Sequence, residues 1–209
     1  MAARATAAVE IVLVIGLILL NIWVLQPLDA PGPDLWSRVG VGLLLLASPW
    51  LHHDSLKRLG LRLETFGSAL LRLIPVSVLA AGLTIAAGYR LGSIDPPVNP
   101  AAEIGTYIAW AAAQQYALQS VVLLRLEDLG LRRGAPLAAA TIFSLVHAPN
   151  PGLMALTFLG GLLWCSTFRK HPSIPAVALS HALLAVTVVS TLPPETTGGL
   201  RIGPAYLQR

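Results

Sequence analysis

The sequence predicts an all-α membrane protein, a polytopic bundle of about seven transmembrane segments with six to eight as the range. Of its 209 residues, 55% are hydrophobic and 11% are charged, and the mean hydropathy is +0.71. A soluble domain of this size would have to expose much of that apolar surface to water, so we expect lipid to surround the chain. Alternating strands of the membrane-barrel type are absent, which favours helices that satisfy their own backbone groups in lipid.

Apolar runs separated by gaps rich in Pro and Gly mark the predicted helices. At about 20 residues per crossing, this length fits a single transmembrane domain over 1–192, followed by a C-terminal extension over 193–209. The first run lacks a clear small-residue cleavage site and is interpreted as a retained helix. The runs cover 7–26, 37–51, 66–89, 103–124, 136–147, 152–168 and 174–192.

The run at 136–147 is too short to cross a bilayer at 1.5 Å per residue. Together with 152–168 it predicts either two crossings or a re-entrant hairpin around Ala148-Pro149-Asn150-Pro151. Both arrangements return the chain to the same side of the membrane, so loop charge leaves the two alternatives open.

Basic residues gather in the gaps after the second, fourth and sixth runs, which predicts that these gaps and the N-terminus face the cytoplasm. We therefore expect a multi-pass protein of the cytoplasmic membrane, whose net charge of +4 reflects topology and not a nucleic-acid partner. Cys165 stands alone in an apolar run and is interpreted as a buried hydrophobic residue. The basic residues are Lys57, Arg58, Arg62, Arg125, Arg132, Arg133, Arg169 and Lys170.

Five polar side chains lie inside apolar runs, where each needs a partner because lipid offers none. Gln114, Gln115 and Gln119 share one run, with Gln115 and Gln119 on one helical face. His147 ends the next run and His181 begins the last. We expect the five to converge inside the bundle. The alternative is that they only fix helix packing through interhelical hydrogen bonds.

Three ordered motifs around these residues resemble the CPBP family, the Abi and CAAX-prenyl-protease-like intramembrane proteases. They are Gln-Gln-Tyr-Ala-Leu-Gln-Ser at 114–120, Phe-Ser-Leu-Val-His-Ala-Pro-Asn-Pro at 143–151 and Ser-His-Ala-Leu-Leu-Ala at 180–185. The family pattern is Glu-Glu-x-x-x-Arg, Phe-x-x-x-His and His-x-x-x-Asn or a similar residue. Arg-Leu-Gly-Leu-Arg at 58–62 also resembles a linker of that family, and the resemblance covers about 55–190.

The chain departs from this family pattern at its charged positions. Gln114 and Gln115 stand in place of the paired glutamates, Gln119 in place of arginine, and Ala185 in place of asparagine. An amide cannot accept a proton as a carboxylate does, and general-base catalysis is typically worth about 100- to 10,000-fold in rate. Losing both carboxylates and the arginine together leaves no orphan charge in the membrane, which indicates a site rebuilt as neutral.

The resemblance implies a membrane-embedded site with His147, His181, Gln115 and Gln114 in the catalytic positions. Binding of an apolar or peptide substrate would fall to Gln119, Phe143, Asn150 and Trp110. Three functions stay open: a divergent hydrolase of prenylated or transmembrane peptides, a non-catalytic pseudoenzyme that binds a partner membrane protein, and a purely structural subunit. No cofactor is predicted, and a divalent metal at His147 and His181 remains an alternative.

Two further charged groups receive simpler interpretations. His52-His53-Asp54 ends the second run at the expected interface, where an interfacial role explains it more simply than a metal. Glu127 and Asp128 are interpreted as local charge balance for Arg132 and Arg133.

Overall fold

The computed structural model describes residues 2–29, 31–96 and 99–208, and the regular elements in this part of the chain are all helical. The all-α prediction is therefore confirmed, and each predicted apolar run coincides with a helical stretch to within one residue at its C-terminal end. The elements are α1 (Ala2–Leu20), η1 (Asn21–Leu25), α2 (Pro31–Leu51), η2 (Leu63–Thr65), α3 (Phe66–Leu91), α4 (Pro100–Gln115), η3 (Tyr116–Leu123), α5 (Leu124–Asp128), α6 (Ala135–Val146), α7 (Pro151–Phe168), α8 (Ile174–Thr191), α9 (Pro194–Thr197), η4 (Gly198–Leu200) and α10 (Pro204–Leu207).

Four helical stretches among the described residues are long and apolar enough to cross a membrane: Arg4–Leu25, Leu63–Leu91, Pro151–Phe168 and Ile174–Thr191. Helix α6 has 12 residues and is apolar, but it reaches only about 18 Å at 1.5 Å per residue. It pairs with α7 as a helical hairpin of unequal arms. Only the α7 arm has the length of a full crossing.

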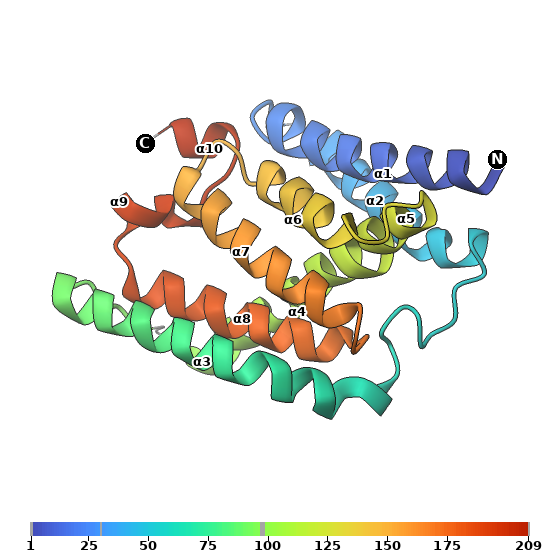
Figure 1. Ribbon diagram of the computed structural model, residues 1–209. Helices are drawn as coiled ribbons and strands as arrows, with labels where there is room; N and C mark the ends of the chain where they lie inside the picture. Colours follow the sequence, from blue (N-terminus) through green and yellow to red (C-terminus); the bar gives the residue numbers. More distant parts are fainter. Residues whose placement is uncertain (1, 30, 97–98, 209) are drawn as a thin grey trace.

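The helices pack as neighbouring pairs, with α3 beside α8 and α6 beside α7, while α1 and α2 lie on the other side of the bundle (Figure 1). Glycines permit the closest approaches. A Cβ at Gly88 would overlap the carbonyl oxygen of Thr191, and a Cβ at Gly161 would lie 3.2 Å from the Cα of Ala140. In lipid such small residues let helix backbones come together and gain van der Waals contact.

The linker at 58–62 enters the core instead of running over the surface. Gly60 has a φ of +69°, and a Cβ there would collide with the ring of Phe168. Its carbonyl accepts a hydrogen bond from the amide of Ile174 at 2.8 Å, and the hydroxyl of Ser120 donates to the carbonyl of Leu59 at 2.9 Å. A residue that tolerates positive φ is therefore needed at this position.

A buried ionic cluster ties α1 and α2 to α5. Arg125 is fully buried and forms an ion pair with Asp54, while its Nη1 donates to Asp128 at 2.6 Å. Its Nε lies 3.2 Å from an oxygen of Glu10, which is itself 6% exposed. The Nε2 of His52 is also 3.2 Å from Glu10, without the alignment of a hydrogen bond. Sequence reasoning missed Glu10, an ionisable residue inside the first apolar run.

Arg58 completes this cluster by pairing with Asp54 and, at 2.5 Å, with Asp128. Burial alone would lower the pKa of the Arg58 guanidinium, but Asp128 and Asp54 raise it overall, so the group stays charged. The predicted balance of Glu127 and Asp128 with Arg132 and Arg133 is therefore wrong. Asp128 pairs with Arg125, one helical turn before it, and with Arg58, while Glu127 accepts from Arg169 at 2.6 Å, because the fold brings Arg58 and Arg169 nearer than Arg132 and Arg133.

The C-terminal tail, expected as an exposed extension, folds back over the turn between α6 and α7. The amide of Gly203 donates to the carbonyl of Ala148 at 2.8 Å. The side chain of Asn150 donates to the carbonyls of Thr197 at 2.7 Å and Arg201 at 3.0 Å. These bonds hold three short helical elements, α9, η4 and α10, against the end of the bundle.

Removing the Arg125 guanidinium should destabilise the whole fold. In Arg125→Met the carboxylate of Asp54, whose side chain is fully buried, loses one of its two cations, and Glu10 loses its arginine. Breaking a buried pair in this way costs about 3–5 kcal/mol. Thermal unfolding in detergent checks this, with Arg132→Met, an exposed position, as the control. Equal midpoints for the two variants would contradict the assigned role of the cluster.

Candidate functional site

Side chains from three helical segments form a hydrogen-bonded chain in the middle of the bundle. The Nε2 of Gln119 in η3 donates to the Oε1 of Gln115 in α4 at 2.9 Å. The Nε2 of Gln115 lies 3.1 Å from the Nδ1 of His181 in α8. Both glutamines are fully buried. The expected pairing of Gln115 with Gln119 on one face is confirmed, and the chain continues to one of the two predicted histidines.

The helix that carries both glutamines changes from α-helical to π-helical winding after Gln115. The residues directly after Gln115 form a π-helix, η3, which is buried from Leu118 to Leu123. π-Helical turns inside α-helices occur frequently at functional sites, and the residue pattern of this run gave no sign of one. The change of winding occurs between the two bonded glutamines, so it sets their relative orientation.

Sequence reasoning missed Trp164, the residue that stacks on the His181 ring. The indole of Trp164 stacks on it with ring centroids 4.4 Å apart and an interplanar angle of 26°. The Trp164 Nε1 donates to the hydroxyl of Ser180 at 3.0 Å, and that hydroxyl is 2.8 Å from the hydroxyl of Ser77 in α3. A tryptophan within an apolar run needs a partner for its N–H when buried, and this was the available signal.

His147 lies at the end of α6 and joins the site through Phe143. The Nδ1 of His147 is 2.6 Å from the carbonyl oxygen of Phe143. The Phe143 ring meets both imidazoles edge-on, with centroid distances of 4.8 Å to His147 and 6.0 Å to His181. The two predicted histidines therefore lie in one site, with a single aromatic ring in contact with both.

These contacts assign a different tautomer to each neutral histidine. Because the Oε1 of Gln115 already accepts from Gln119, its Nε2 must donate, so the Nδ1 of His181 accepts and its proton lies on Nε2. The Nδ1 of His147 must donate to a carbonyl, so its Nε2 carries a lone pair. His147 is thus oriented as a base and His181 as a donor.

A cavity of about 420 Å³ between α1, α2, α4 and α6 reaches His147. Its wall is mostly apolar and also includes Gln114, Phe143 and Trp110. Gln115, Gln119 and His181 do not line it. The structure therefore places Gln114 at the cavity and Gln115 behind it. The apolar lining residues are Val14, Ile15, Ile18, Ile22, Val41, Gly42, Leu45, Ala113, Ala117, Leu118, Val122, Ile142, Val146 and Ile202.

The backbone amide of Asn150 donates to the carbonyl of His147 at 3.3 Å, but the side chain of this predicted site residue makes its contacts elsewhere. Its Oδ1 accepts from the amide of Leu153 as the N-cap of α7, and its Nδ2 holds the C-terminal tail. Both ends of the amide are used in these backbone contacts.

The donor set offers little to a metal ion. Among the described residues, no three His, Cys, Asp or Glu side chains gather as ligands for one. The Nδ1 atoms of His147 and His181 face a carbonyl and an amide, and His52 faces Glu10.

Comparison with known proteins gives one family. The family model described as type II CAAX prenyl endopeptidase Rce1-like matches residues 11–187, which is most of the chain. No curated protein and no solved structure matches the chain. The matched range contains the whole hydrogen-bonded chain and both histidines.

Replacing Gln115 by leucine breaks the row of hydrogen bonds and should lower the stability of the protein more than the same replacement at Gln114. In Gln115→Leu the Nε2 of Gln119 and the Nδ1 of His181 lose their partner, and each buried group left unpaired costs about 1–3 kcal/mol. Gln114→Leu is the matched control, because no described residue hydrogen-bonds its side chain. Thermal unfolding in detergent measures the stability of both variants. Equal losses of stability would show that the hydrogen bonds of Gln115 contribute nothing to it.

Proposed function

The chain belongs to the type II CAAX prenyl endopeptidase Rce1-like family, and we propose that it binds a peptide with an apolar chain in the cavity beside His147 and hydrolyses it with that histidine as base. The observation that carries this proposal is the apolar cavity lined by His147, whose Nε2 is hydrogen-bonded to no described residue and can accept a proton.

The cavity suits an apolar ligand in size and lining. Small-molecule pockets commonly measure about 300–1,000 Å³ and combine apolar walls with a few polar groups. Besides His147, the polar residues of the wall are Gln114 on α4, Asn21 on η1, Gln26 directly after η1, and Arg38 on α2. A prenylated peptide is the substrate that the family's name suggests, and a transmembrane peptide is the second substrate of this kind.

The proposed reaction uses His147 as the proton carrier. Its Nε2 takes a proton from a water molecule, and the resulting hydroxide attacks the peptide carbonyl. The Gln114 amide, which no described residue hydrogen-bonds, donates to the oxyanion that forms. The imidazolium then returns the proton to the leaving nitrogen as the C–N bond breaks. A positioned histidine is the most frequent general base in enzymes.

The buried chain behind the cavity supports His147 indirectly. Gln119 and Gln115 fix the tautomer and direction of His181. His181 and His147 both contact the ring of Phe143, whose backbone carbonyl sets the tautomer of His147. Gln115, Gln119 and His181 are therefore positioning residues in this proposal.

A second function is supported by the absence of acid at the cavity. No described Asp or Glu side chain lines it. Without a carboxylate, the same cavity serves a non-catalytic member of the family that holds an apolar peptide or a partner membrane protein without cleaving it.

We infer an orientation with the basic end of the bundle in the cytoplasm. The N-terminus, α5 and the connection from α7 to α8 lie at the same end (Figure 1). That end carries the basic stretches 57–62, 125–133 and 169–170. An excess of Lys and Arg in short loops marks the cytoplasmic side.

Replacing His147 separates the two functions. Purified protein in detergent is given prenylated and transmembrane peptides, and His147→Gln, which keeps a polar side chain, is compared with the wild type. Loss of a general base should lower the cleavage rate by about 100-fold or more. Unchanged cleavage in a folded His147→Gln protein would exclude His147 as the base. If the wild type binds peptide without cleaving it and Gln114→Glu gains cleavage, the non-catalytic function is correct.

Filling the cavity should block binding without unfolding the protein. Gly42 lines the cavity and a Cβ there meets nothing within 4 Å, so Gly42→Leu projects a side chain into the cavity. We expect at least about a tenfold loss of peptide affinity from the lost apolar contact. Gly82→Leu is the matched control, because Gly82 is equally open but lies on α3, away from the cavity. Equal affinities for the two variants would place the peptide elsewhere.

A further inference from the structure

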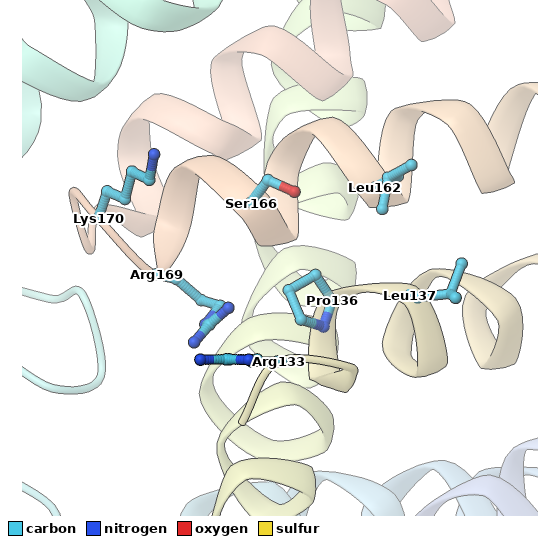
Figure 2. Close-up of a pocket in the computed structure, with 7 residues that line it drawn as sticks. All are labelled: Arg133, Pro136, Leu137, Leu162, Ser166, Arg169 and Lys170. Carbon is cyan, nitrogen blue, oxygen red and sulfur yellow. The ribbon is translucent and has the colours of Figure 1, made fainter. Parts of the chain in front are cut away.

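A second pocket, of about 460 Å³, lies at the other end of α6, where the chain enters that helix and leaves α7 (Figure 2). It contains none of the residues around His147. Its lining is divided, with cationic side chains toward one end and leucines toward the other (Figure 2). The lining residues are Arg133, Pro136, Leu137, Leu162, Ser166, Arg169 and Lys170.

The cationic end of the pocket is short of negative charge. Arg133 and Arg169 both line this end of the pocket (Figure 2). Arg169 pairs through its Nε with Glu127 at 2.6 Å, which leaves its terminal nitrogens for another acceptor. No described acidic residue pairs with Arg133 or Lys170. Three cations around one pocket therefore share a single carboxylate, and their mutual repulsion would be relieved by a bound anion.

The chemistry of these donors matches a phosphate group. Arginine presents a planar fork of N–H donors that fits phosphate oxygens, and lysine adds a compact positive charge. The hydroxyl of Ser166, half-buried on α7 one turn before Lys170, adds a neutral donor. The described residues give this hydroxyl no hydrogen bond of its own.

The position and the leucines indicate that the phosphate belongs to a lipid. Arg169 and Lys170 directly follow the membrane-crossing stretch Pro151–Phe168, so the cations lie where headgroups lie, whichever side of the membrane they face. Leu137 is 55% exposed and lies with Leu162 beyond the cations, toward the apolar part of the hairpin (Figure 2). An acyl chain attached to the phosphate would cover both leucines.

We propose that this pocket binds an anionic phospholipid, with the phosphate between Arg133, Arg169 and Lys170 and an acyl chain along Leu137 and Leu162. Anionic lipids of the cytoplasmic leaflet are known to attract basic segments next to a membrane helix. This pocket goes beyond such attraction, because it combines a fork of donors with a hydroxyl and an apolar wall in one place.

The experiment titrates delipidated full-length protein in detergent with phosphatidylglycerol, and with phosphatidylcholine of the same acyl chains, by native mass spectrometry. We expect Arg133→Gln/Lys170→Gln to weaken phosphatidylglycerol binding about tenfold, because two charge-assisted contacts are lost. The matched control is Arg132→Gln/Lys57→Gln, which removes the same charge from exposed residues outside the pocket and should bind as the wild type does. Equal weakening in the two double variants would overturn the proposal in favour of a diffuse surface charge.

Competition identifies the part of the ligand that is recognised. Inorganic phosphate and glycerol phosphate are added at the same concentration as the lipid. If either displaces phosphatidylglycerol as well as the intact lipid does, the pocket holds a soluble phosphate and the lipid assignment is wrong. If phosphatidylcholine binds as tightly as phosphatidylglycerol, the anionic selectivity is wrong. Leu137→Ser should lower the affinity for phosphatidylglycerol and leave the affinity for glycerol phosphate unchanged.

Discussion

Lipid supplies no hydrogen bonds, and this one constraint determines where polar side chains lie in the bundle. A polar group in the hydrocarbon region must find its partner on another helix, because water is absent. Ser77, Ser180 and Trp164 therefore form one chain of contacts across α3, α8 and α7. Gln119, Gln115 and His181 form a second chain across η3, α4 and α8. The two chains meet where Trp164 stacks on His181, so packing and the candidate site share the same contacts.

The buried polar groups at one end of the bundle are charged, whereas those in its middle are neutral. At the end where α1, α2 and α5 meet, carboxylates and guanidinium groups are buried together, with Asp54 shared by Arg58 and Arg125. Around His181 the partners are neutral amides. A single buried carboxylate beside Gln119 would have no cation to offset its desolvation. The glutamines at positions 115 and 119 keep the middle of the bundle neutral, and Gln115 is hydrogen-bonded to Gln119 and His181.

Features that depend on a single segment could be predicted from the sequence. Features that depend on contacts between segments could not. Helix positions followed from hydropathy, and the Gln115–Gln119 pair followed from helical spacing. The burial of Arg125 was missed because its partners lie in other segments, Glu10 on α1 and Asp54 in the connection after α2. Trp164 was missed for the same reason, since its partner is Ser180 on α8. The division between Gln114 at the cavity and Gln115 behind it depends on how α4 is rotated against α1 and α6.

That rotation has a chemical consequence. A group that exchanges protons with water or substrate must reach the cavity, and only the amide of Gln114 and the imidazole of His147 do so among the predicted catalytic residues. Gln115 uses its oxygen and its nitrogen on Gln119 and His181, so its contribution passes through the orientation of neighbouring rings. In the proposed function, contact with the substrate therefore falls to Gln114 and orientation of the histidine to Gln115, although the two glutamines are adjacent in the sequence.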